Sequence, residues 1–257
     1  RLFFKKDGYL YDETRNMLMQ EFSDITIVNN IVEQIASGNN TLNTIAGKIG
    51  EKEPTVLYSL DKLISVGLVE KKKCITEEKN KKKTQYVLKD YMFKFWYEFI
   101  PKATSVIEIG QGEIYYQKAV KPILHSFMGA VFEDMCRYYT LKKGIIGEYG
   151  CFITSVGTWW GVENIKDKYG NMRTQSVDID VVALSEVDKK ALVGECKFKN
   201  EKIDKSIYET LVSRGKLLPA KYKVSKYILF SLAGYTDWVE SLSDEDVVLL
   251  TLDSIYE

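Results

Sequence analysis

Three charged residues stand on two apolar segments in the C-terminal half of this 257-residue sequence. Asp180 lies within VDIDVVAL, and Glu195 and Lys197 lie within VGECKFK, which follows it. Both segments are too apolar for edge strands, so we expect two central strands of a sheet. Because side chains alternate along a strand, Glu195 and Lys197 share one face.

A charge on a buried strand is costly unless it is paired or bound to a cation. Asp180 and Glu195 offer carboxylate oxygens, which suit Mg²⁺ or Mn²⁺, and such ions keep waters at their other positions. Lys197 would then stand beside a metal-bound water, where an ammonium favours hydroxide and offsets charge developing on a phosphoryl group. The pattern predicts a metal-dependent phosphodiesterase, and the alternative is a structural ion pair.

The elements around these segments predict a mixed α/β domain over residues 122–257. We expect a long helix from Pro122 to about Leu141, strands at 151–160, 174–184 and 191–198, a helix at 202–217, a strand at 227–231, a helix at 236–242 and a strand at 247–252. This order resembles that of the restriction-endonuclease-like core. The resemblance implies an α/β domain with a mixed sheet.

The N-terminal part predicts a winged helix-turn-helix domain over residues 23–90. Asp24, Thr41 and Glu53 each begin a short helix, and segments 68–70 and 84–88 form a hairpin. The third helix exposes polar residues but no arginine that would read guanine: Glu51, Lys52, Thr55, Ser59 and Lys62. We expect a helical connector over 91–121, and we expect the aromatic side chains of residues 90–100 to form a core between the two domains.

The loop between the two strands of this hairpin is basic. Residues 71–83 hold seven lysines against two glutamates, a surplus that suits a phosphate backbone. A solvated loop tip is the alternative interpretation. The residues predicted to contact DNA are Lys79, Lys81, Lys82 and Lys83.

The spacing D-x14-E-x-K on neighbouring strands after a helix resembles the PD-(D/E)XK nuclease superfamily. The segments VDIDVVAL and VGECKFK also resemble the DUF234 domain at the C-terminus of archaeal-type P-loop ATPases. That family has a winged helix between its ATPase and its nuclease-like domain, so the resemblance spans residues 1–257. It implies that residues 1–22 are the tail of an ATPase lid. The sequence has no G-x-x-x-x-G-K-[ST] motif, so either the chain is a fragment or the ATPase has been lost. Because the sequence starts at Arg1 without a methionine, we expect a fragment whose ATPase partner lies upstream.

Carried over to this sequence, the resemblance makes Asp180 and Glu195 metal ligands and Lys197 the catalytic lysine. It adds Glu133 from the preceding helix, in the segment GAVFE. Small residues would let that face approach the sheet: Ser126, Gly129, Cys136 and Thr140. A solvent-exposed Glu133 is the alternative. The implied function is a metal-dependent DNA endonuclease or DNA-processing module, and its rival is a catalytically degenerate module that binds DNA or protein and regulates the ATPase.

Composition narrows these functions further. Lys plus Arg and Asp plus Glu are equal at 36 each, so DNA binding must rest on local patches. The four cysteines show no CxxC spacing, and the single histidine, His125, leaves carboxylates to carry any catalysis. No apolar run approaches 18 residues, and no signal peptide is evident. We therefore expect a cytoplasmic protein without a membrane partner, and the sequence predicts no oligomeric state.

Overall fold

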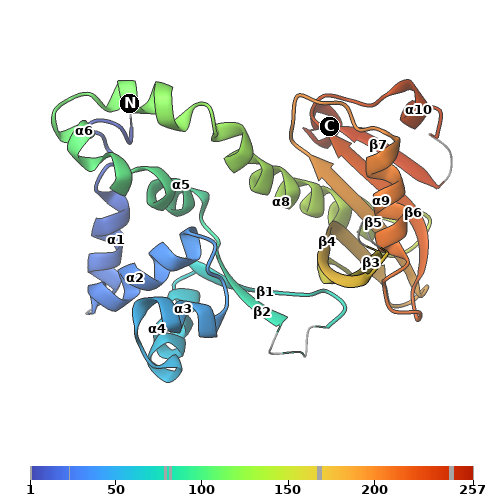
Figure 1. Ribbon diagram of the computed structural model, residues 1–257, viewed down its shortest axis with the longest axis horizontal. Helices are drawn as coiled ribbons and strands as arrows, with labels where there is room; N and C mark the ends of the chain where they lie inside the picture. The colour runs from blue at the N-terminus through green and yellow to red at the C-terminus, as the bar shows by residue number, and fades with distance from the viewer. Residues whose placement is uncertain are drawn as a thin grey trace. The chain divides into compact units, whose positions relative to one another are not determined.

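The computed structural model describes residues 2–22, 24–77, 80, 83–166, 170–242 and 246–256. The chain divides into two compact units. The first comprises Arg1–Lys72 and Asn80–Leu124, and the second comprises Lys73–Lys79 and His125–Glu257. Helices dominate the first unit, whereas the larger sheet lies in the second (Figure 1).

The first unit begins with four helices and a hairpin, followed by further helical segments. Its elements are α1 Glu13–Glu21, α2 Ile25–Ala36, α3 Leu42–Ile49, α4 Glu53–Ser65, β1 Val69–Lys73, β2 Thr84–Leu88, α5 Tyr91–Phe99, η2 Pro101–Ala103, α6 Thr104–Glu108, α7 Gly112–Tyr115 and η3 Tyr116–Val120. The predicted caps are present, since Asp24 accepts from the Ile27 N–H at 3.3 Å and Thr41 from the Thr44 N–H at 3.3 Å. The hairpin strand β1 pairs with β2.

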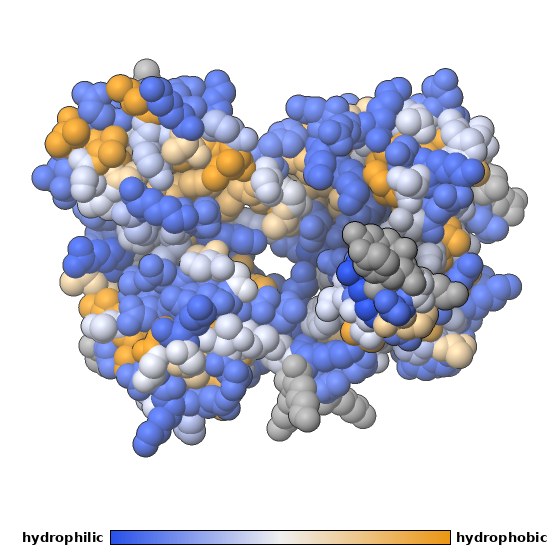
Figure 2. All heavy atoms as spheres, viewed as in Figure 1, coloured by the Kyte–Doolittle hydropathy of each residue, from blue (hydrophilic) through white to orange (hydrophobic). Residues whose placement is uncertain are grey.

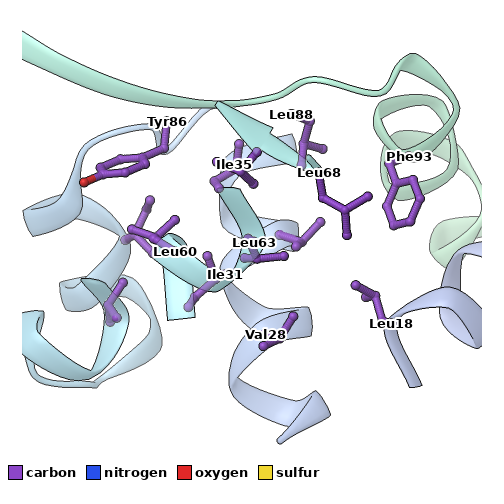
Figure 3. Packing of buried hydrophobic residues seen from close by; sticks show 14 of the residues in the cluster. Leu18, Val28, Ile31, Ile35, Leu60, Leu63, Leu68, Tyr86, Leu88 and Phe93 are labelled. Atoms are coloured by element: carbon purple, nitrogen blue, oxygen red, sulfur yellow. The ribbon is translucent and has the colours of Figure 1, made fainter. Parts of the chain in front are cut away.

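One hydrophobic core cluster joins the helices α1 to α5 and the β1-β2 hairpin, and Figure 3 shows part of it. Ile31 of α2 and Leu60 of α4 are fully buried in it, and Leu88 of β2 packs beside them. Apolar residues at helical spacing on α2 and α4 explain this packing. The aromatic helix α5 contributes the fully buried Phe93, so its side chains belong to the core of the first unit.

The second unit follows the predicted order of elements. They are α8 Leu124–Ile145, β3 Ser155–Lys166, β4 Met172–Ser185, β5 Lys190–Lys197, α9 Lys205–Gly215, β6 Lys223–Ser231, α10 Asp237–Glu240, β7 Val247–Thr251 and α11 Leu252–Tyr256. The predicted bounds were wrong for β3, which begins at Ser155 rather than Cys151 and continues to Lys166. The final helix α11 was not predicted.

The five strands form one mixed sheet in the order β3-β4-β5-β6-β7. The pairs β3/β4 and β4/β5 are antiparallel, and the pairs β5/β6 and β6/β7 are parallel. Two core clusters lie on opposite faces: Val193 packs with Leu211 of α9, whereas its neighbour Leu192 packs with Phe132 of α8. Helices thus cover both faces, which explains why β5 is an almost uninterrupted buried strand.

The face of α8 that packs on the sheet consists of Phe132, Cys136, Thr140 and Gly144. The predicted small-residue face is therefore confirmed at Cys136 and Thr140 but wrong at Ser126, which is exposed. Gly144 is required by close approach, because a Cβ atom there would overlap the side chain of Ile153.

Polar and charged residues cover most of the face shown in Figure 2, and apolar residues form small separate patches on it. Across the described ranges, no helix combines the length and the apolarity needed to cross a membrane.

Candidate active site

The predicted charged residues lie where β4 and β5 separate. The two strands pair from Ser185↔Lys190 to Val181↔Gly194. Beyond that point β5 stays paired with β6, whereas β4 pairs only with β3. Asp180 and Glu195 are the first residues past the last pair, one on each strand. The separation of the strands therefore brings the two carboxylates to the same position along the sheet.

A β-bulge occurs in β4 at Asp180. Gly157 of β3 pairs with Val182 of β4, and the next pair is Trp159 with Ile179. Between these two pairs β3 advances by two residues and β4 by three, so β4 contains one extra residue. Ile179 and Val182 accordingly pack in the same core cluster, although strict alternation would put them on opposite faces. Bulges re-aim side chains and are frequent next to active sites. The pattern of apolar and polar residues in the sequence does not indicate the bulge in β4.

Asp180 is a half-buried carboxylate in a crowded acidic environment. One of its oxygens, Oδ2, accepts a hydrogen bond from the Cys196 N–H at 2.9 Å. Burial first, and then the charges of Glu195 and Glu133, raise the pKa of Asp180 to about 7. The Cys196 N–H and Lys197 act in the opposite direction but do not outweigh them. Near neutral pH, the protonated and the ionised forms of Asp180 are therefore both populated.

Lys197 and Glu195 form a pair on one face of β5, as strand alternation predicts. Glu195 is buried, with 8% of its surface exposed, and its Oε1 accepts from Lys197 Nζ. Burial alone would lower the pKa of Lys197, but the neighbouring Glu195 and Asp180 carboxylates outweigh it and raise that pKa. Lys197 thus remains a cation and is suited to stabilising negative charge rather than to accepting a proton.

Glu133 belongs to the same cluster. Its side chain is 33% exposed, and its Oε2 accepts from Arg137 Nη1 at 3.4 Å. The same Nη1 donates to the main-chain carbonyl of Asp180 at 2.8 Å. Glu133 therefore faces the carboxylates of the sheet from α8, and its negative charge contributes to the raised pKa of Asp180.

Sequence reasoning missed Arg137. The only signal in the sequence was its spacing of four residues from Glu133, and such acid–base pairs on helices are usually solvated surface pairs. In the structure Arg137 is only 13% exposed. Its position under the cluster depends on the packing of α8 against the sheet.

The fit of a metal ion can be judged from the donor set. Within the described ranges, no three His, Cys, Asp or Glu side chains are arranged closely enough to enclose an ion. Mg²⁺ and Mn²⁺ do not need such a cage, because they bind through one or two carboxylates and keep waters elsewhere. Asp180 and Glu195 meet this requirement, because both offer hard carboxylate oxygens. Glu133 faces them from α8 but does not form a three-ligand group with them in this structure.

The residues predicted to contact DNA are mostly beyond structural description. Lys79, Lys81 and Lys82 lie outside the described residues, and Lys83 is half-buried directly before β2. On α4, the predicted exposed face was wrong at Ser59, which is buried with 8% exposure. The other four polar residues of that predicted face are exposed: Glu51, Lys52, Thr55 and Lys62.

Residues 96–207 match the DUF234 family, described as archaea bacterial proteins of unknown function. The predicted DUF234 resemblance is confirmed over this range, which contains Glu133, Asp180, Glu195 and Lys197. The chain is also 28% identical over 249 residues to MJECL04, an uncharacterized protein of Methanocaldococcus jannaschii. That alignment covers 96% of this chain and 52% of the relative, so the chain spans about half the length of that protein.

A solved structure of a point mutant of ZitR from Lactococcus lactis overlaps with part of the chain at a TM-score of 0.27 and 16% identity. The overlap covers 49% of this chain and 95% of that one. This likeness is too slight to assign a fold.

Proposed function

We propose that the second unit is a Mg²⁺- or Mn²⁺-dependent phosphodiesterase that cleaves DNA. The observation that carries this proposal is the convergence of Asp180, Glu195 and Glu133 beside Lys197, at the point where two central strands separate. An acidic site beside a lysine ammonium is the arrangement expected for metal-assisted phosphoryl chemistry.

The proposed fold of this unit is restriction-endonuclease-like. Its support is the order α8-β3-β4-β5-α9-β6-α10-β7, together with a mixed sheet in which β4 alone runs against the other four strands. The resemblance of D-x14-E-x-K to the PD-(D/E)XK motif points to the same class. A fold of this kind hosts more than one function, so the activity depends on the site itself.

In the proposed mechanism, Asp180 and Glu195 would hold the ion through carboxylate oxygens, and Glu133 would face it from α8. The bound ion would supply Lewis acidity toward a phosphoryl oxygen and lower the pKa of a coordinated water. Lys197 is kept in its ammonium form by Glu195. It would stabilise the negative charge that grows on the phosphoryl oxygens.

For the first unit we propose a winged helix-turn-helix that binds DNA without strong sequence preference. The three helices α2, α3 and α4, the β1-β2 hairpin and the lysine surplus over residues 71–83 support this proposal. The predicted loop was too long at its start, because Lys71, Lys72 and Lys73 belong to β1. The resemblance to archaeal-type ATPases further supports a P-loop ATPase upstream of this chain in a cytoplasmic protein.

A second candidate function is a catalytically degenerate module that binds DNA or protein and regulates the ATPase. The observation that favours it is the internal pairing of charges, since Lys197 pairs with Glu195 and Arg137 pairs with Glu133. These pairs offset part of the negative charge without an ion. The two functions therefore differ in whether a divalent cation binds and whether DNA is cut.

The test is cleavage of plasmid and single-stranded DNA by the purified chain with Mg²⁺ or Mn²⁺. We expect nicking or cutting that a chelator stops and that Asp180→Ala abolishes. Asp178→Ala is the matched control, because Asp178 lies two residues earlier on β4 with a side chain that is 64% exposed. If Asp180→Ala and the wild type cut equally, the activity comes from another site or a contaminant. A folded wild type that neither cuts DNA nor binds either ion favours the degenerate module.

A further inference from the structure

Arg137 connects α8 to the bulge of β4. Its Nη1 lies within hydrogen-bonding distance of three acceptors, which share its two N–H groups: the Asp180 carbonyl at 2.8 Å, Thr158 Oγ1 at 3.2 Å and Glu133 Oε2 at 3.4 Å. Its Nη2 pairs with Asp134 on the same helix. One side chain therefore contacts two carboxylates of α8, a hydroxyl of β3 and the main chain at the predicted metal ligand.

These contacts are unlike those of an ordinary surface ion pair. The guanidinium is only 13% exposed, and a buried cation of this kind is tolerated only when acceptors satisfy it. Its acceptor at Asp180 is a carbonyl in the bulge, where the regular ladder between β3 and β4 is interrupted. Arg137 therefore holds the irregular backbone that aims Asp180, and it also restrains Glu133.

We propose that Arg137 is a positioning residue for the metal site, which fixes Glu133 of α8 and the Asp180 main chain of β4 at one separation. This inference rests on the proposed function, because a positioning role requires an ion to be held. Replacing a group that orients a metal ligand typically lowers metal affinity or activity by about 10- to 100-fold.

An electrostatic role and a positioning role of Arg137 predict opposite changes in metal affinity when this residue is replaced. A cation beside an ion-binding site repels the ion, so a purely electrostatic role predicts tighter metal binding when the charge is removed. A positioning role predicts weaker binding even when the charge is kept. Lysine retains the charge but lacks the planar fork of donors, and therefore separates the two effects.

The experiment is a titration of the metal-free chain with Mn²⁺, in which electron paramagnetic resonance measures the free and bound Mn²⁺. We expect Arg137→Lys to weaken Mn²⁺ binding about tenfold, and Arg137→Gln to weaken it as well, because lost positioning outweighs the relief of charge repulsion. The matched control is Arg214→Lys. Arg214 on α9 also donates to a carbonyl of β4, that of Asp178 at 2.9 Å, but its ion pair is with the Asp178 carboxylate at 3.7 Å and not with Glu133 or Asp180. Its replacement should change Mn²⁺ affinity by less than about twofold.

A double-mutant cycle tests whether Arg137 acts through Glu133. The loss in the combined Arg137→Lys, Glu133→Gln variant should be smaller than the product of the two single losses. Multiplicative losses, or Mn²⁺ affinity that is unchanged or higher in folded Arg137→Lys and Arg137→Gln proteins, would overturn the positioning role while leaving the metal site intact. A wild type that binds no Mn²⁺ overturns both this inference and the proposed function.

Discussion

Replacement of Asp180 by asparagine separates a metal site from a structural ion pair without any substrate. Asparagine keeps an oxygen that can accept from the Cys196 N–H, which Asp180 now accepts at 2.9 Å. It removes only the negative charge that repels Glu195 and Glu133. Lys197 retains its partner Glu195, so the substitution does not leave a buried ammonium unpaired.

The magnitude follows from the pKa of Asp180, which rises from 3.8 to about 7 on folding. Between these values the native state binds a proton that the unfolded state has released. The contribution of Asp180 to the free energy of unfolding of the wild type therefore falls as pH rises from about 4 to about 7, and is then level. A difference of about 3 pKa units corresponds to about 4 kcal/mol at most. Asp180→Asn lacks this loss, and we expect it to be more stable than the wild type by at least about 1 kcal/mol at pH 8.

The assay is a thermal melt of both proteins from pH 4 to pH 8, in chelator and in Mn²⁺. In chelator at pH 8, the melting temperature of the mutant should exceed that of the wild type by at least about 2 °C. Mn²⁺ should stabilise the wild type alone, because an ion that binds the native state shifts its unfolding. Asp178→Asn serves as the exposed control and should match the wild type. A mutant that melts well below the wild type in chelator would contradict this reasoning, because it would show that the ionised Asp180 carboxylate stabilises the fold instead of repelling Glu195 and Glu133.

Three further predictions concern packing, capping and DNA contact. Gly144→Ala should destabilise the protein by about 1–3 kcal/mol in chemical denaturation, because its Cβ would overlap Ile153, whereas Gly129→Ala on the same helix meets open space and should not destabilise. Asp90→Ala should cost about 1 kcal/mol by the same measurement, since Asp90 accepts from the Met92 N–H at 2.7 Å and caps α5. Four lysines of the hairpin loop are replaced together by serine: Lys79, Lys81, Lys82 and Lys83. This change should flatten the slope of log DNA affinity against log salt concentration, and an unchanged slope would show that these lysines do not contact phosphate.

Much of the fold could be predicted because local signals and tertiary packing agree. Asp24 and Thr41 precede apolar residues at helical spacing, and both cap the helices that follow them. Alternation along β5 likewise predicted that Glu195 and Lys197 share a face, where they form an ion pair. In these cases the neighbouring residues alone determine the conformation.

The features that the sequence did not reveal depend on contacts between distant segments. The bulge at Asp180 is one extra residue relative to β3, and no periodic pattern within β4 marks it. The extension of β3 to Lys166 was missed because it pairs only with the polar start of β4, where main-chain hydrogen bonds replace apolar alternation. Arg137 acquires its role only when α8 packs against that bulge.

The most direct test of the proposed phosphodiesterase is Mn²⁺-dependent DNA cleavage by Lys197→Ala. The account predicts that this variant binds Mn²⁺ nearly as well as the wild type but loses cleavage by about 100-fold or more, because a lost charge stabiliser costs mainly turnover. Lys205→Ala is the matched control, since Lys205 is 57% exposed and pairs with Glu209 at 3.6 Å on α9. Cleavage by Lys197→Ala at the wild-type rate would contradict the account.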